Sequence, residues 1–174
     1  MQYKSWGNVY MMDETRKISS KVLFTAIEEL LAENWQAVFT VTGMSMWPFL
    51  CHGRDQVVLK RCDLDKLKKG DVVLFQTPLG NYMLHRITRL EGEQFETTGD
   101  GNCFRDGLFP RNCVKAKACS FIRKGKTISC DAPLWQMIFD IWSFLYPIRR
   151  YLLWGLRGLS HVKAWVRNRF SVCN

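Results

Sequence analysis

The first periodic pattern along the chain is a helical one. Between residues 18 and 33, apolar side chains recur at intervals of three or four, at positions 18, 22, 23, 26, 27, 30 and 31. This spacing predicts an amphipathic helix, and Ser19 or Ser20 can serve as its N-cap. The segment is short and carries a lysine and several glutamates, so we expect it to pack on a domain and not to span a bilayer.

From residue 35 to about residue 125 the pattern changes to short extended runs separated by turn residues. The candidate strands are residues 37–41, 56–60, 71–76, 81–88, 94–98 and 114–122. Glycine or proline occurs in each of the separating segments, as expected of turns. This spacing suits antiparallel hairpins better than strand–helix–strand units, so we expect a mainly β, antiparallel domain.

After Pro133 the pattern becomes helical again, and much more aromatic. Gln136, Asp140 and Ser143 fall on one narrow helical face, and the remaining face is broad and apolar. Pro147 and the basic pair that follows it interrupt the segment, which leaves an apolar part of about sixteen residues. A helix that crosses a bilayer needs roughly 20 consecutive apolar residues. We therefore expect two amphipathic helices.

The charge of the chain is concentrated in this tail. Residues 133–174 hold six Lys or Arg and one acid, out of a net charge of +9 for the whole chain. Aromatic anchors beside positive charge are typical of helices that lie on a membrane, so residues 134–170 are interpreted as contacting a membrane surface or a partner. The alternative is that the segment closes the core of the β domain. Nucleic-acid binding accounts for the charge but not for the apolar face, and is disfavoured. The pattern specifies no oligomeric state.

With 174 residues, 47% of them hydrophobic, the chain can bury a core of its own. We expect an N-terminal arm and helix over residues 1–34, a β domain over 35–132, and a basic, aromatic-rich amphipathic helical tail over 133–174. Seven cysteines without a C-x-x-C pair, and only three histidines, indicate free thiols, no metal site and no cofactor. The first thirty residues contain no uninterrupted apolar run, so no signal peptide is expected. The predicted location is cytoplasmic, or peripheral at the cytoplasmic membrane.

One serine stands out in the apolar stretch VTGMSMWPFL, residues 41–50. Ser45 can be an ordinary turn residue, or a nucleophile presented where Trp47-Pro48 stops a strand. A serine hydroxyl attacks well only when a base removes its proton and a third group orients that base. His85, in the middle of a candidate strand, is the best-placed base, although a structural role in the core is the commoner one for such a histidine. His52 follows Ser45 closely in a turn, and His161 lies in the basic tail.

The segment GDGNCFRDG, residues 99–107, supplies two candidate carboxylates, Asp100 and Asp106. Asp-Gly is also a common turn sequence, so each aspartate has a simpler explanation. The catalytic interpretation rests on the order in which the segments occur along the chain. Gly-x-Ser-Met-x-Pro comes first, a Gly-Asp strand start and Tyr-x-x-His-Arg follow, and Gly-Asp-x-Asn with a later Asp comes last.

Four ordered blocks, GMSMWPFL, KKGDVVLF, YMLHRI and TGDGNCFRD, resemble the S24/S26 peptidase superfamily, which unites LexA-like self-cleaving repressors with type I signal peptidases. GMSM is similar to the LexA-like nucleophile box. HRI followed by GDxN is similar to the signal peptidases of the endoplasmic reticulum and archaea, which use a histidine base. The resemblance covers roughly residues 38–120. It implies a signal-peptidase-like antiparallel β fold and peptide hydrolysis through an acyl-enzyme.

Carried over by position, the resemblance makes Ser45 the nucleophile, His85 the general base and Asp106 the orienting acid, while Asp100 supports the loop or stands in for Asp106. It implies a peptide or protein substrate bound in extended form along a strand edge. The oxyanion region would be Gly43, Met44 and Met46 around Ser45, whose own N–H is the first donor. Signal peptidases often have a hydroxyl two residues before the serine. That position is Gly43 here, so the second donor is left open.

Two departures from the family bear on the substrate. No transmembrane helix precedes the serine, unlike the tethered signal peptidases. The first 42 residues contain no Ala-Gly or Cys-Gly bond and are too few for the repressors' DNA-binding domain. We therefore expect a serine endopeptidase that processes a peptide or protein near a membrane. The alternative is a catalytically silent binding module of the same fold, attached to a membrane or partner through its basic tail.

Overall fold

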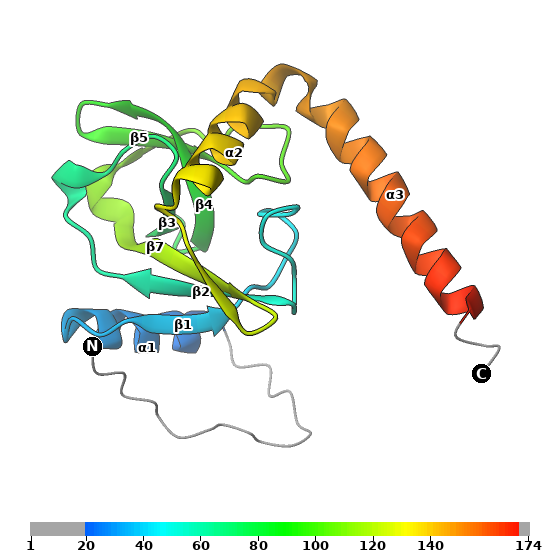
Figure 1. The fold of residues 1–174 in the computed structure, drawn as a ribbon. Helices are drawn as coiled ribbons and strands as arrows, with labels where there is room; N and C mark the ends of the chain where they lie inside the picture. The colour runs from blue at the N-terminus through cyan, green and yellow to red at the C-terminus, as the bar shows by residue number, and fades with distance from the viewer. Residues whose placement is uncertain (1–19, 171–174) are drawn as a thin grey trace.

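The computed structural model of the protein describes residues 20–170, with the backbone alone for 20–23, 25 and 160–170. A mainly antiparallel sheet forms the body, with helices around it (Figure 1). Its strands are β1 (Ala37–Thr40), β2 (Asp55–Lys60), β3 (Val72–Gln76), β4 (Tyr82–Glu91), β5 (Gln94–Thr98), β6 (Leu108–Pro110), β7 (Val114–Arg123) and β8 (Lys126–Ser129). The helices are α1 (Ser20–Ala32), α2 (Pro133–Phe144) and α3 (Arg149–Phe170), with single 3-10 turns η1 (Leu64–Lys66), η2 (Arg111–Cys113) and η3 (Tyr146–Ile148).

The strands lie in the order β1-β2-β7-β3-β4-β5-β6, with β8 paired to β7, and every pairing is antiparallel. The expectation of a mainly β, antiparallel fold is therefore confirmed, and all six predicted strands are present. Two strands were not predicted. β6 has three residues and ends in proline, and β8 is a mostly exposed run of four, so neither has the apolar alternation that marks a strand.

The core lies on both faces of the sheet. In β3, Val72 and Leu74 pack with α1 and β7 in one cluster, while Val73 and Phe75 pack with β5 in another. A strand buried on both faces reads as a continuous apolar run, which accounts for the sequence VVLF. Helix α1 contributes Ile27 and Leu31 to the first cluster, as its helical stripe predicts. Residues 1–19, including the predicted helix start at 18 and 19, lie outside the described part.

Helix α2 packs on the body of the protein, and α3 contacts it through buried Leu153 and through Arg157 before its far end leads away (Figure 1). Trp135 stacks edge-on against Phe121 of β7 at 5.2 Å, and Phe139 and Trp142 are buried against Phe49. The tail therefore closes part of the core of the β domain, as the alternative interpretation of residues 133–174 proposed. As predicted, two helices form, with η3 at the interrupting Pro147. No helix within residues 20–170 is long and apolar enough to cross a membrane.

The outer side of the same tail carries a row of exposed apolar side chains. They are Leu134, Met137, Ile141, Phe144, Ile148, Tyr151, Trp154, Leu156 and Leu159. Tyr151 is 73% exposed and Trp154 is 80% exposed, unusually high values for residues of this size. The tail thus has two faces, one in the core and one presented to solvent. Its last residues, 171–174, lie outside the described part.

Candidate active site

Ser45 lies in a loop of turns between β1 and β2, and not in a strand. Strand β1 already ends at Thr40, so the expectation that the strand continues to Trp47-Pro48 is wrong. Turn hydrogen bonds from Trp47 N to Met44 O (3.1 Å) and from Leu50 N to Met46 O (2.9 Å) shape the loop. Met46 is buried in the core while Met44 is half exposed, so Met46 anchors a turn that leaves Ser45 partly open to solvent.

His85 and Asp106 form a short, buried pair. Nδ1 of His85 lies 2.6 Å from Oδ2 of Asp106, and both side chains are about 95% buried or more. An ionised carboxylate can only accept, so Nδ1 carries the proton and Nε2 of the neutral ring has a free lone pair. The hydroxyl of Thr97 donates to the same carboxylate oxygen at 2.8 Å. Sequence reasoning did not identify Thr97, because a strand threonine has no distinguishing pattern.

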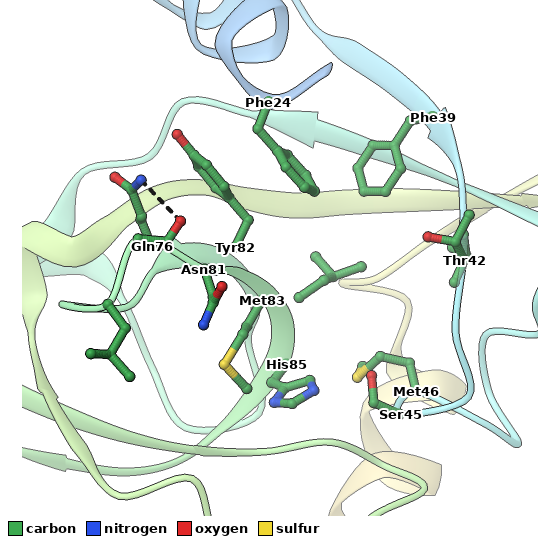
Figure 2. A pocket seen from close by; sticks show the side chains of 14 residues that line it. Phe24, Phe39, Thr42, Ser45, Met46, Gln76, Asn81, Tyr82, Met83 and His85 are labelled. Atoms are coloured by element: carbon green, nitrogen blue, oxygen red, sulfur yellow. Dashed lines mark hydrogen bonds between the residues drawn. The ribbon is translucent and has the colours of Figure 1, made fainter. Parts of the chain in front are cut away.

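Ser45 and His85 line the same pocket, which has a volume of about 740 Å³. Figure 2 shows the two side chains beside each other at one end of the pocket, with the imidazole ring turned toward Ser45. Among the described residues the Ser45 hydroxyl has no hydrogen-bond partner, and the pair is not yet in hydrogen-bond contact. Such bonds are often long before a substrate binds.

The backbone amides around Ser45 are available as donors. Within the described residues, neither the Ser45 N–H nor the Met46 N–H donates to an acceptor. The N–H of Gly43 is engaged, because it donates to Nδ1 of His52 at 3.1 Å. Gly43 has a φ of +87°, a conformation that favours glycine, so the shape of the turn accounts for this residue. His52 thus supports the turn, and the side chain of His161 lies outside the described part.

A glycine-rich loop packs directly on the Ser45 turn. The amide of Gly101 donates to the carbonyl oxygen of Ser45 at 2.7 Å. A Cβ atom at Gly99 would lie 2.5 Å from Ser45 O, and one at Gly101 would lie 2.6 Å from Met44 O. Real Cβ atoms do not approach backbone oxygens so closely, so both positions require glycine. The pattern GDG, which reads as a turn, is in fact a site of close backbone approach.

Asp100 does not reach His85 but forms a buried ion pair with Arg86. Nε and Nη2 of Arg86 donate to its two carboxylate oxygens at 2.9 and 2.7 Å. Nη1 of Arg86 donates to Gly70 O at 2.8 Å, and the guanidinium lies 3.8 Å from the ring centre of Phe139. Of the two candidate carboxylates, the structure therefore brings Asp106 to the histidine, and Asp100 supports the loop.

Helices of the tail hold the same loop from outside. Trp142 Nε1 donates to Asp100 O at 3.1 Å, and the Tyr146 hydroxyl donates to Cys103 O at 3.3 Å. Nη2 of Arg157 donates to Gly101 O at 3.4 Å. The loop that contacts Ser45 and carries Asp106 is therefore fixed by α2, η3 and α3 together. Nothing in the tail sequence predicted these contacts.

Two strand edges border the pocket. β1 is the terminal strand of the sheet, and β5 pairs with β4 only from Arg86 onward. In the described part of the chain, residues 82–85 therefore have a strand neighbour on the β3 side alone. Phe39 of β1 and Tyr82 and Met83 of β4 line the pocket beside these edges (Figure 2), and so does Leu84.

Three of the described cysteines, Cys51, Cys62 and Cys130, are poor candidates for a competing nucleophile. The six described cysteines are free, and Cys173 lies outside the described part. Burial raises the pKa of the Cys130 thiol to about 11, and it also raises the pKa of Cys51 and of Cys62. A thiol is reactive as its thiolate, so these three are poor nucleophiles at neutral pH.

No protein-family model matches the chain, and no curated protein matches it in sequence. The chemistry therefore has to be inferred from the side chains themselves. A serine with free neighbouring amides shares a pocket with a histidine whose ring is fixed by a carboxylate. These are the parts that nucleophilic acyl transfer requires.

Proposed function

We propose that the protein is a serine endopeptidase of the S24/S26, signal-peptidase-like type, in which Ser45 is the nucleophile, His85 the general base and Asp106 the acid that orients it. The observation that carries the proposal is the buried 2.6 Å contact between His85 and Asp106 in a pocket shared with Ser45. A histidine held by a carboxylate on Nδ1 has Nε2 free to take a proton from a serine.

The mechanism follows from these positions. Nε2 of His85 removes the hydroxyl proton as Ser45 Oγ attacks the carbonyl carbon of the scissile bond. The negative charge that develops on the carbonyl oxygen is stabilised by the unengaged N–H groups of Ser45 and Met46. The protonated His85, stabilised by Asp106, then gives its proton to the leaving amine. Water, activated by the same histidine, hydrolyses the acyl-enzyme on Ser45.

We infer that the substrate is a peptide segment bound in extended form. The open edges of β1 and of residues 82–85 can pair with such a segment through main-chain hydrogen bonds. The pocket walls beside them carry aromatic and aliphatic side chains, so apolar side chains on the substrate are favoured. The 2.9 Å hydrogen bond between the Tyr82 hydroxyl and Glu28, together with the stacking of Tyr82 on Phe24 at 4.4 Å, keeps one wall in position.

We further infer that the protein works at a membrane surface, to which its tail attaches. The exposed apolar row on α2 and α3 is too extended for ordinary surface residues and lies beside exposed Arg150. Aromatic side chains next to arginine suit the interface of an anionic bilayer. The same face also suits the second candidate function, a binding module of this fold without catalysis. Activity therefore has to be measured directly.

The proposal is tested by incubating the purified protein with a diverse peptide mixture and identifying the products by mass spectrometry. We expect cleavage that disappears in Ser45→Ala and persists in Ser120→Ala, a half-buried serine on β7 that is the matched control. The same cleavage in wild type and in Ser45→Ala would contradict the peptidase and leave the binding module.

A further inference from the structure

A second, smaller pocket lies outside the proposed catalytic residues. Its volume is about 80 Å³, and it is lined by Lys69, Thr88, Arg105, Ser143, Tyr146 and Arg149. These residues come from the turn before β3, from β4, from the loop after β5, and from α2, η3 and α3. The pocket therefore exists only where the tail helices close on the β body.

The lining of this pocket is strongly cationic. Arg105 pairs with Glu96 at 2.9 Å, and Glu96 also accepts a hydrogen bond from the Thr88 hydroxyl at 3.3 Å. Lys69 forms no ion pair with any residue in the described part of the chain. Asp100, the carboxylate whose charge acts on Arg149, is already bound by Arg86. The lining itself contains three cations and no acid, and Glu96 pairs with Arg105 alone among them, so the pocket has an excess of positive charge.

Arg149 gives the pocket a buried, incompletely satisfied cation. The residue is only 3% exposed, and its single protein hydrogen bond runs from Nη2 to Trp142 O at 3.1 Å. Its Nε is buried and has no partner. Burial removes water from this guanidinium and lowers its pKa. A desolvated charge of this kind is costly unless an opposite charge pairs with it.

We propose that this pocket binds a phosphate group. Arg149 and Arg105 supply guanidinium donors that suit a tetrahedral oxyanion, and Lys69 supplies a third charge. The Ser143 hydroxyl lines the same space, forms no hydrogen bond with any described residue and can donate to a remaining oxygen. The hydroxyls of Thr88 and Tyr146 also line the pocket, but they already donate to Glu96 and to Cys103 O. The volume is larger than one water needs and far smaller than the roughly 300 Å³ of a small-molecule site, so it fits a single small anion.

The phosphate can belong to a free phosphate compound or to the headgroup of an anionic lipid. The headgroup source is consistent with Phe144, which follows Ser143 and exposes 83% of its surface. A phosphate held between Arg149 and Arg105 joins the tail to the loop after β5. In that loop Asp106 directly follows Arg105. The site does not depend on the peptidase proposal, because none of its residues takes part in the proposed chemistry.

The test uses the full chain and two probes. Isothermal titration calorimetry measures the affinity for inorganic phosphate against sodium chloride of matched ionic strength. Flotation measures binding to vesicles of phosphatidylcholine alone and of phosphatidylcholine mixed with phosphatidylglycerol in equal parts. The variant is Lys69→Ala with Ser143→Ala, which leaves buried Arg149 in place so that the protein folds. Lys126→Ala, an exposed lysine on β8, is the matched control.

We expect wild type and Lys126→Ala to bind phosphate saturably, and the double variant to bind at least about tenfold more weakly, as the loss of two direct donors predicts. Selective loss of binding to the phosphatidylglycerol vesicles in the double variant, without measurable binding of inorganic phosphate, would support the site and identify a lipid headgroup as the source. If the double variant matches wild type with both probes, the phosphate site is overturned.

Discussion

The amide of Gly101 donates a 2.7 Å hydrogen bond to the carbonyl oxygen of Ser45. This bond joins two loops that are far apart in the sequence, and the loop of Gly101 also carries Asp106, the partner of His85. One loop therefore sets the position of the Ser45 turn and supplies the acid. The tail helices hold that loop through its carbonyl oxygens, so the proposed catalytic geometry depends on elements outside the sheet.

Replacing Gly101 by alanine is expected to damage both stability and activity. The added Cβ would lie 2.6 Å from Met44 O and 2.8 Å from Trp47 O, so the two loops must separate. We expect the free energy of unfolding to fall by about 1–3 kcal/mol, the usual cost of overpacking, and the acylation rate of Ser45 to fall with it. Urea unfolding measures the free energy of unfolding, and the rate at which a serine-reactive acylating probe labels Ser45 measures acylation.

The control for this substitution is Gly155→Ala. Gly155 lies in α3, and a Cβ there meets nothing within 4 Å. Because alanine is the better helix former, this variant should be as stable as wild type or slightly more stable. Equal stability of Gly101→Ala and Gly155→Ala would contradict the close approach of the loops.

Asp106→Asn separates orientation of the histidine from folding. An amide cannot hold His85 in the tautomer that leaves Nε2 free, so we expect acylation to slow by about 10³- to 10⁴-fold, the scale of the equivalent change in serine proteases. The thermal midpoint should change little by comparison, because asparagine has the same shape as aspartate. An unchanged acylation rate would remove Asp106 from the proposed mechanism.

The buried Asp55 makes stability depend on acid pH. Burial alone raises the pKa of this carboxyl, but hydrogen bonds from Arg54, Arg123 and the Cys51 amide together hold it well below its ordinary value. A depressed pKa stabilises the fold fully above the unfolded value of about 3.9. This stabilisation is lost as the pH falls through the lower folded pKa.

Asp55→Asn removes this contribution. The free energy of unfolding of the Asp55→Asn variant should therefore lie furthest below that of wild type at neutral pH. The difference between the two proteins should shrink below about pH 4. Urea titrations at a series of pH values measure the difference, with Asp140→Asn, an exposed aspartate on α2, as the control. A difference that stays constant into the acid range would show that Asp55 does not contribute in this way.

The exposed side of α3 is expected to carry the affinity for membranes. Tyr151→Glu combined with Trp154→Glu removes two large apolar anchors and adds negative charge, so binding to vesicles that contain phosphatidylglycerol should weaken at least about tenfold. Stability should be unaffected, because both side chains point to solvent. Leu108→Glu, an exposed leucine on β6, is the control for added charge. Flotation of the double variant equal to wild type would count against attachment through the tail.

Point variants are preferable here to removal of the whole tail. Phe139 and Trp142 of α2 are buried in the body, and Trp142 donates to Asp100 O. A chain that ends near Pro133 would expose this part of the core, and loss of vesicle binding could then reflect unfolding.

Sequence patterning predicted the body of the fold because burial imposes it directly. The short extended runs between turn residues predicted six of the eight strands, and the helical stripe predicted α1. The pairing of His85 with Asp106 was implied only by the resemblance that the four blocks carry, and in the structure Nδ1 of His85 lies 2.6 Å from Oδ2 of Asp106. The continuous apolar run VVLF was also predicted as a strand, and its lack of alternation reflects burial on both faces.

The parts that the sequence did not predict depend on contacts between distant segments. Ser45 was expected at a strand end, yet turn hydrogen bonds and buried Met46 place it in a loop. The glycines at 99 and 101 read as turn residues, although the close approach of another backbone requires them. The pocket around Arg149 joins four separate regions of the chain, and no local pattern marks such a site.

The role of Ser45 as nucleophile can be measured by treating the protein with a serine-reactive acylating β-lactam probe, followed by intact-mass measurement and peptide mapping. We expect a single adduct on wild type that maps to Ser45 and is absent from Ser45→Ala and His85→Ala. An adduct of equal yield on wild type and Ser45→Ala, or one that maps to another residue, would contradict this role.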